Sequence, residues 1–157
     1  MKKMFLSLVF VLGALSLVNA QENAIGLKFG DGVDLSYQRM LSSSNRLEFN
    51  LGLNSFKKNS PFTLSCAYQW VWDLSQLSPG FKWHAGAGAM LGVASYKVLN
   101  ESNTDFYVWA IGNVGIEYNF REFPLQLALD WTPALRFTPN SGSFGAEGIR
   151  LAARYRF

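Results

Sequence analysis

The chain contains one cysteine, Cys66, and one histidine, His84, among its 157 residues. A lone cysteine cannot form an internal disulfide, so no disulfide framework holds this fold together. The same two residues are too few for a structural zinc site, which takes four ligands that are mostly cysteine and histidine. The stretch GDGVD at residues 30–34 lacks the length and the ligand count of a calcium-binding EF-hand loop. The sequence therefore predicts no metal site and no cofactor.

Long apolar runs are also missing after residue 20, so no further segment has the length of a transmembrane helix. The first twenty residues, MKKMFLSLVFVLGALSLVNA, have a basic start, a short apolar run and a small-residue end at Val18-Asn19-Ala20. This is the layout of a secretory signal peptide. The alternative, an N-terminal helical anchor, is disfavoured because the run is short and no basic stop-transfer sequence follows. We assign residues 1–20 to a cleaved signal peptide and residues 21–157 to one mature domain.

The chain has little excess charge of either sign. The formal net charge is +3, but two of the basic residues are Lys2 and Lys3 in the signal peptide. The remaining chain has 12 basic and 11 acidic side chains. This balance gives no reason to expect a nucleic-acid partner, in spite of a sequence pI near 9.1.

Helical periodicity is hard to find after residue 24, where apolar and polar residues alternate with a period of two. This alternation is typical of β-strands that have two different faces. Turn-forming residues such as Asp31-Gly32 separate eight such segments. The segments span residues 24–30, 32–38, 46–54, 61–72, 80–96, 106–120, 124–131 and 147–157. The pattern predicts an all-β fold, an eight-stranded antiparallel up-and-down β-barrel.

Eight alternating strands fit two kinds of barrel, a lipocalin-like soluble barrel with an apolar interior and a transmembrane barrel with an apolar outer belt. The polar faces of the strands favour the second, because they carry four charges of each sign. Inside a narrow barrel every buried charge needs a partner, and small residues in the same rows leave room for long arginines. The predicted interior charges are Lys28, Lys82, Arg150 and Arg154 against Asp34, Glu48, Glu117 and Asp130, and the small residues are Gly86, Gly88, Gly115, Ala128 and Ala152.

Aromatic residues and connection lengths favour the same reading. Two aromatic girdles and longer loops at one end are typical of outer-membrane barrels. The connections SFKKNS, KVLNESNTD and TPNSGSFGAE are generally longer than SSSN, SQLSPG and REFP, although GDG is short. Pro133 lacks a backbone donor, so we expect it at a bulge or above the membrane plane. One predicted girdle contains Trp70, Trp72, Phe81, Trp83, Tyr118, Phe120, Phe123, Tyr155 and Phe157, and the other contains Phe56, Phe62, Tyr96, Phe106 and Phe137.

With these features in place, residues 21–157 resemble the small eight-stranded outer-membrane β-barrels of the OmpA, OmpX and OmpW type from Gram-negative bacteria. The ending IRLAARYRF is similar to the C-terminal insertion signal of that class, with Phe157 last and Tyr155 two residues before it. The stretch IEYNFREFPLQLALDWTP resembles the sixth-to-seventh hairpin of an uncharacterised, porin-family-like branch. The resemblance implies an outer-membrane location and contact with lipopolysaccharide and phospholipid. It also implies recognition of Tyr155 and Phe157 by the barrel-assembly machinery.

Three functions remain open at this stage. An eight-stranded interior is just wide enough to be filled with side chains, which favours a plugged, salt-bridged barrel with a structural or surface-interaction role through loops 56–60 and 138–145. The first alternative, implied by the OmpW resemblance, is a narrow channel or binding barrel for a small apolar molecule. The second is a lipid A-modifying enzyme. We expect no enzyme, because Gly86 stands where the barrel deacylases have a serine two residues after the histidine. His84 is expected to be a hydrogen-bonded interior residue.

Overall fold

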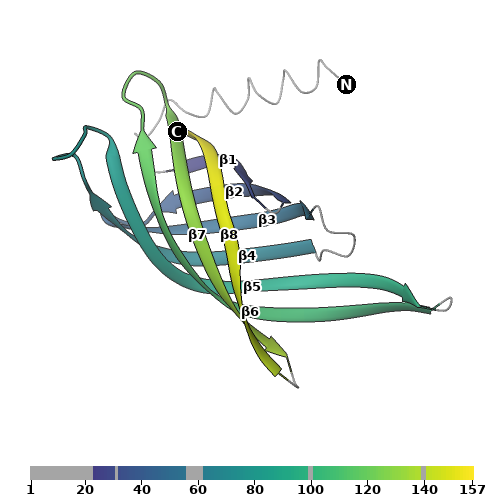
Figure 1. Ribbon diagram of the computed structural model, residues 1–157. Coiled ribbons are helices and arrows are strands. Elements are labelled where there is room, and N and C mark those ends of the chain that lie inside the picture. Colours follow the sequence, from purple (N-terminus) through teal and green to yellow (C-terminus); the bar gives the residue numbers. More distant parts are fainter. Residues whose placement is uncertain (1–22, 31, 56–61, 99–100, 139–140) are drawn as a thin grey trace, which may run out of the picture.

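The computed structural model of the chain describes residues 23–30, 32–55, 62–98, 101–138 and 141–157. Within these ranges the chain forms eight β-strands (Figure 1). The predicted signal peptide, residues 1–20, lies outside the described residues. The strands are β1 (Asn23–Phe29), β2 (Gly32–Met40), β3 (Asn45–Ser55), β4 (Phe62–Asp73), β5 (Phe81–Val98), β6 (Glu101–Asn119), β7 (Leu125–Thr138) and β8 (Ser141–Arg156).

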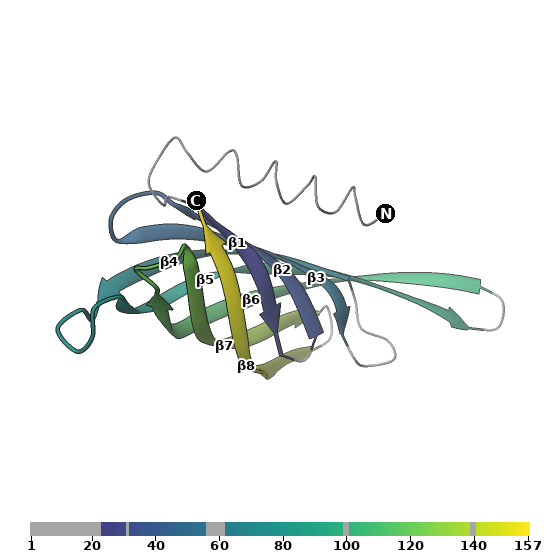
Figure 2. The ribbon, with the colours of Figure 1, turned by 90° about the horizontal axis from the view of Figure 1, so that it is seen from above.

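The strands form one closed barrel in which each strand pairs antiparallel with its neighbour in the sequence. β8 closes the barrel against β1 (Figure 2). In this register Gly26 lies opposite Arg154. Both ends of the described chain lie together, because Asn23 and Phe157 exchange backbone hydrogen bonds of 3.1 and 2.9 Å. The predicted all-β, up-and-down barrel is confirmed. We call the end at Asn23 and Phe157 the terminal mouth and the opposite end the distal mouth.

The connections at the terminal mouth are short turns that satisfy their own backbone groups. The amide of Leu41 donates to the carbonyl of Asn45 at 2.9 Å between β2 and β3, and the amide of Phe120 donates to the carbonyl of Leu125 at 3.0 Å between β6 and β7. Gly80, in the turn between β4 and β5, has a φ of +94°, a conformation that glycine adopts without the steric cost a side chain would bring. These turns lie where the alternation predicts them.

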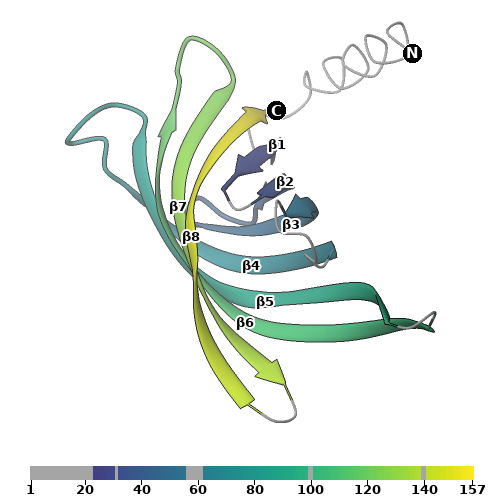
Figure 3. The same ribbon diagram turned by 45° about the vertical axis from the view of Figure 1, so that its right-hand side comes forward.

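The connection between β5 and β6 differs from the sequence prediction. The pattern predicts a loop over residues 97–105, whereas β5 continues to Val98 and β6 begins at Glu101, and these two residues are paired. The prediction was wrong because two strands can satisfy their backbone groups by pairing with each other, whatever their side-chain pattern. The register of β4 with β5 ends at Val93. Beyond that residue β5 and β6, still paired with each other, project from the barrel as a ribbon (Figures 1 and 3).

The connection between β7 and β8 needs the same correction. A surface loop is predicted over residues 138–145, but β7 runs to Thr138 and β8 begins at Ser141, opposite it in the register. Most of the predicted loop is therefore strand, again because antiparallel pairing continues outward to the end of the hairpin. The other predicted surface loop, residues 56–60, lies outside the described residues.

The two faces of the barrel wall have opposite polarity. Glu48 and Asp130 are each 1% exposed inside the barrel, whereas Leu127 and Leu151 on the outer wall are 37% and 52% exposed. The predicted sidedness, with charges inside and apolar side chains outside, is confirmed. Among the described residues, no helix has the length and apolar character needed to cross a membrane.

The interior is not polar throughout. Near the distal mouth, Ala67, Ile111 and Ala134 form a small buried apolar cluster, and Met90 and Trp109 pack against it. This cluster explains why two apolar residues, Trp109 and Ile111, interrupt the inward polar row of β6. The lumen thus has a polar part toward the terminal mouth and a partly apolar layer toward the distal mouth.

Aromatic rings gather at both ends of the wall. Toward the distal mouth Phe62, Phe106 and Phe137 are 53%, 78% and 61% exposed. Phe56 and the side chain of Tyr96 lie outside the part of the chain that is described. Toward the terminal mouth the rings pair with centroid distances between 4.2 and 6.4 Å, in the pairs Trp72–Trp83, Phe81–Tyr118, Tyr118–Phe120, Phe120–Phe123 and Tyr155–Phe157.

Pro133 lies at an irregularity of the sheet, as expected. The register of β7 with β8 shifts between Trp131 and Thr132. On the other side of β7, the register with β6 is interrupted between the pairs Ile111–Ala134 and Val114–Trp131. A residue without an N–H group is tolerated where the ladder is already broken.

Candidate functional site

The interior of the barrel holds a connected network of charged and amide side chains. The pleat of a strand sends alternate side chains to the same face, so residues two apart in one strand point into the lumen together. Because the sheet is closed, strands that are far apart in the sequence direct their inward rows at one another. Within the described residues, the ion pairs form a central quartet, a cluster around His84 and a pair near the distal mouth.

The central quartet consists of Lys28, Glu48, Asp130 and Arg154. The Nζ atom of Lys28 lies 2.6 Å from Glu48 Oε1 and 2.7 Å from Asp130 Oδ2. The Nη2 atom of Arg154 lies 3.1 Å from Glu48 Oε2 and 3.7 Å from Asp130 Oδ2. Each cation therefore contacts both carboxylates, and the four formal charges cancel.

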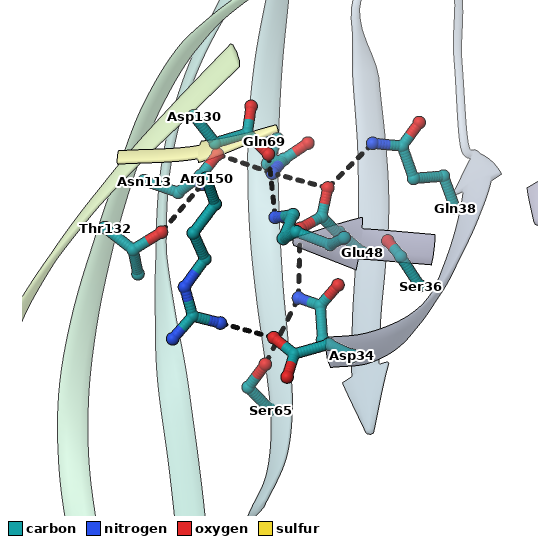
Figure 4. A network of polar contacts seen from close by, with 12 residues as sticks. Asp34, Ser36, Gln38, Glu48, Ser65, Gln69, Asn113, Asp130, Thr132 and Arg150 are labelled. Atoms are coloured by element: carbon teal, nitrogen blue, oxygen red, sulfur yellow. Dashed lines mark hydrogen bonds and ion pairs between the residues drawn. The ribbon is translucent and has the colours of Figure 1, made fainter. Parts of the chain in front are cut away.

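Glu48 is the residue on which the quartet and the neighbouring amides converge (Figure 4). Besides the two cations, Gln38 donates to its Oε2 at 2.7 Å, Gln69 donates to the same oxygen at 3.2 Å, and Asn50 donates to Oε1 at 3.0 Å. The amide of Gln69 also donates to Asn113 Oδ1 at 2.7 Å. One carboxylate thus receives donors from strands β1, β2, β3, β4 and β8.

The His84 cluster lies next to the quartet. Arg46 Nη1 lies 2.6 Å from Glu117 Oε2. The ring of His84 stands between two carboxylates, with Nδ1 3.3 Å from Glu117 Oε2 and Nε2 3.0 Å from Asp130 Oδ1. Arg46 also donates through Nε to Gln69 Oε1 at 2.5 Å. Asp130 and Gln69 therefore join this cluster to the quartet, so the charged core is continuous.

The third group is a single ion pair, Arg150 with Asp34, toward the distal mouth (Figure 4). Their side chains are 18% and 11% exposed, whereas the quartet residues are at most 2% exposed. This pair is the part of the network nearest to solvent.

Seven of the eight predicted interior charges take part in these ion pairs, and Lys82 is the exception. It is half-buried and lies opposite Asp73 of β4 and Glu117 of β6 in the two registers. Sequence reasoning left Arg46 and Arg156 out of the interior set. Both residues follow the same alternation as the predicted interior charges, since Arg46 stands two residues before Glu48 and Arg156 two residues after Arg154.

The geometry around His84 does not resemble a catalytic pair. Both ring nitrogens face carboxylates. The hydroxyl of Ser36 accepts a hydrogen bond from Arg154 Nε at 2.9 Å, and the hydroxyl of Ser65 accepts one from Asn50 at 3.2 Å. A serine nucleophile needs its hydroxyl within about 3 Å of a histidine that acts as base. His84 is instead a fully buried interior residue that stands between two carboxylates.

Inward glycines make the space that these large side chains fill. A Cβ atom on Gly115 would stand 2.7 Å from the carbonyl oxygen of Leu129 and 2.8 Å from Cε1 of His84. Both distances are shorter than van der Waals contact, and one of the two neighbours is backbone. A side chain at residue 115 would therefore displace His84 or the wall of the barrel.

We expect the substitution Gly115→Ala to lower the free energy of unfolding by about 1–3 kcal/mol, the usual cost of overpacking. The measurement is a urea titration of the refolded protein in detergent micelles, followed by tryptophan fluorescence. Gly112→Ala in the same strand is the matched control, because its nearest neighbour would be Cγ of Pro133 at 3.1 Å. Equal losses in the two variants would contradict this account of Gly115.

No protein-family model matches the chain, and no curated protein sequence matches it. Its structure is similar to the N-terminal β-barrel domain of Pseudomonas aeruginosa OprF, with a TM-score of 0.62 and 13% identity over 88% of this chain and 100% of that one. It is also similar to Neisserial surface protein A, NspA, with a TM-score of 0.55 and 14% identity over 86% of this chain and 93% of that one. At these identities the likeness is one of fold, and it agrees with the resemblance to small eight-stranded barrels.

Proposed function

We propose that this chain is an integral outer-membrane β-barrel protein with a structural or surface-interaction role and a plugged, salt-bridged interior. The observation that carries the proposal is the polarity of the wall. Large apolar side chains such as Leu91, Leu129 and Ile149 are 53%, 43% and 68% exposed on the outside. Soluble proteins rarely leave contiguous apolar patches larger than a few hundred Å² in water. Lipid removes that cost for a whole belt of such residues.

The role of the charged core in this proposal is to fill the lumen. Arg154, His84 and Gln69 are fully buried, and they lie among carboxylates that compensate the charges. A side-chain plug of this kind suits an eight-stranded barrel, whose interior is just wide enough to be packed. The proposal therefore includes neither a wide diffusion pore nor a catalytic role. The similarity to the barrel domain of OprF and to a protein named a surface protein supports the location.

The distal ribbon is the part best suited to contact with other molecules. Among the described residues, the pairing of β5 with β4 ends at Val93 and that of β6 with β7 ends at Val108, while β5 and β6 stay paired with each other beyond these residues. The outer edges of such a ribbon carry backbone donors and acceptors that can pair with a further strand. In the proposed orientation this ribbon extends from the outer surface of the cell.

Assembly is proposed to depend on the last strand. Tyr155 and Phe157 lie at the terminal mouth with ring centroids 6.4 Å apart, and by resemblance they form the signal that the barrel-assembly machinery recognises. Deletion of Phe157 is expected to lower the amount of assembled protein in the outer membrane of an expressing Gram-negative host. The refolding yield of the purified variant in detergent serves as the control, since the machinery is absent there. A normal assembled level would contradict the role of this residue.

Fractionation and gel migration test the location. The protein is expected in the outer-membrane fraction, and the unheated sample is expected to migrate differently from the boiled one, because a closed barrel resists detergent unfolding. Recovery in the soluble fraction without detergent would overturn the proposal. Planar-bilayer recordings test the plug, since a filled lumen gives no large steady conductance. A stable large conductance would favour the channel instead.

A further inference from the structure

The ring of His84 lies between two carboxylates that belong to different strands. Its Nδ1 atom is 3.3 Å from Glu117 Oε2 on β6, and its Nε2 atom is 3.0 Å from Asp130 Oδ1 on β7. The ring is fully buried, and neither nitrogen has a further hydrogen-bond partner among the described residues. The protonation state of the ring therefore depends first on these two carboxylates.

A glycine makes this arrangement possible. In the registers His84 of β5 lies opposite Gly115 of β6, and Gly115 lies opposite Asp130 of β7. A Cβ atom on Gly115 would collide with Asp130 Oδ1 and would stand 2.8 Å from His84 Cε1. Because residue 115 has no side chain, His84 and Asp130 meet across β6. Glu117 occupies the next inward position of β6, since alternate residues of a strand share a face.

A neutral imidazole does not suit both of these neighbours. One of its nitrogens carries a proton and the other a lone pair, whereas both nitrogens of an imidazolium carry protons. In the neutral form one carboxylate oxygen would face a lone pair within 3.3 Å, and burial leaves this repulsion poorly screened. In the imidazolium each carboxylate faces a proton. The geometry therefore favours the doubly protonated ring.

The charged groups around the site determine how firmly such a proton is held. Both carboxylates that face the ring also contact cations, at 2.6 Å for Glu117 and at 2.7 and 3.7 Å for Asp130. These cations, which oppose a further positive charge, are Arg46 of β3, Lys28 of β1 and Arg154 of β8. The other charged groups of the quartet and of the terminal mouth are Glu48 of β3, Asp73 of β4, Lys82 of β5 and Arg156 of β8. A proton that two carboxylates hold and several cations oppose is released within the accessible pH range.

The site adjoins a cavity at the terminal mouth. The cavity has a volume of about 60 Å³, and Glu117 and Arg46 are among its lining residues. A space for one water needs roughly 10–15 Å³ by the same measure, so the cavity has room for several waters. Glu117 thus links the buried ring to a space that water can enter, and a proton can reach His84 without unfolding of the barrel.

We propose that His84 is an imidazolium at neutral pH and that its proton acts as a pH-sensitive latch, which joins β5 to β6 and β7 inside the barrel. In the unfolded chain an ordinary histidine loses its proton at about pH 6.5. Above that pH the folded barrel binds one proton more than the unfolded chain, so stability falls as the pH rises. The contribution of the latch is complete below about pH 6.5 and is lost as the folded ring releases its proton. The inference goes beyond the proposed function, because it assigns a proton-binding site that depends on the fold alone.

NMR of the imidazole nitrogens tests the proposal directly, because the chain contains one histidine. The sample is the full chain with isotope-labelled histidine, purified without a histidine tag and refolded in detergent micelles. At about pH 7.5 an ordinary histidine is about one-tenth protonated. The folded barrel is expected to show a protonated fraction about fivefold higher or more at that pH, with the nearly equal nitrogen shifts of an imidazolium. A mostly neutral ring, with the split shifts of a single tautomer, would overturn the proposal.

Urea unfolding at several pH values provides a second readout. The folding equilibrium constant of the wild type is expected to fall by up to about tenfold per pH unit between about pH 7 and 8, the effect of one proton. His84→Gln is expected to remove this dependence, because glutamine does not titrate. Glu122→Gln, at an exposed residue of the turn between β6 and β7, is the control and is expected to keep it. An equal pH dependence in His84→Gln and the wild type would overturn the latch. The NMR measurement uses the wild type, so it decides the question even when the variant does not fold.

Discussion

The substitution Glu48→Ala is expected to lower the free energy of unfolding of the barrel by about 3–5 kcal/mol, the cost of removing one partner from a buried ion pair. Glu48 is 1% exposed and accepts Lys28 at 2.6 Å and Arg154 at 3.1 Å. Without it, Asp130 is the one carboxylate left to two buried cations, and the amide of Gln38 loses its acceptor. The measurement is the urea midpoint of the protein refolded in lipid vesicles, with tryptophan fluorescence and gel migration as the two readouts.

Two further variants separate charge from packing at this site. Glu48→Gln keeps the volume and removes the charge, so it is expected to remain strongly destabilised. Lys28→Met combined with Glu48→Gln removes one charge of each sign and is expected to recover much of the loss, because replacing a whole buried pair is often neutral or stabilising. Glu122→Gln, at an exposed residue of the turn between β6 and β7, is the control for a charge change outside the lumen. A small loss in Glu48→Ala would mean that the network does not stabilise the barrel.

The same residues show what the sequence could reveal about the fold. Alternation places Lys28, Glu48 and Arg154 on the inner face. With a period of two, assigning one residue of a strand to a face also fixes the face of every other residue in that strand. Charge balance then selects the polar face as the inside. The sequence does not reveal which of these charges form ion pairs with one another. Arg154 could have met any of four carboxylates, and its choice of Glu48 and Asp130 depends on the stagger of the closed sheet, which no local pattern encodes.

The residues that sequence reasoning missed have a common position. Arg46 and Arg156 stand at strand ends, where a residue on the polar face can equally point to solvent. Their placement in the lumen follows from the pairing of β3 with β4 and of β8 with β1. The distal hairpins were missed for a related reason. Residues 101–105 have the composition of a loop, but the pairing partner across the hairpin determines their backbone. The pattern of one segment does not show whether a second segment will pair with it.

A charge on the outer wall provides the sharpest test of the membrane assignment. Leu129→Arg is expected to cost about 2–4 kcal/mol in a bilayer, the range for arginine at the midplane on the lipid face of such a barrel. Leu129 is 43% exposed and lies between Ile116 and Leu151 of the neighbouring strands, in the middle of the apolar belt. The measurement is the urea dependence of folding into lipid vesicles. An arginine at this position is costly when the surface faces acyl chains, because its charge is then placed in hydrocarbon.

Leu77→Arg is the matched control, because Leu77 is 79% exposed in the turn between β4 and β5 and is expected to tolerate the charge with little change. In a soluble barrel both leucines would face water, and surface substitutions there usually stay within about 0.5 kcal/mol. The difference between the two variants therefore depends on the solvent around Leu129. A large loss confined to Leu129→Arg requires a hydrocarbon environment at that depth. Equal, small effects would instead require water there, and the apolar belt would then need another partner to cover it.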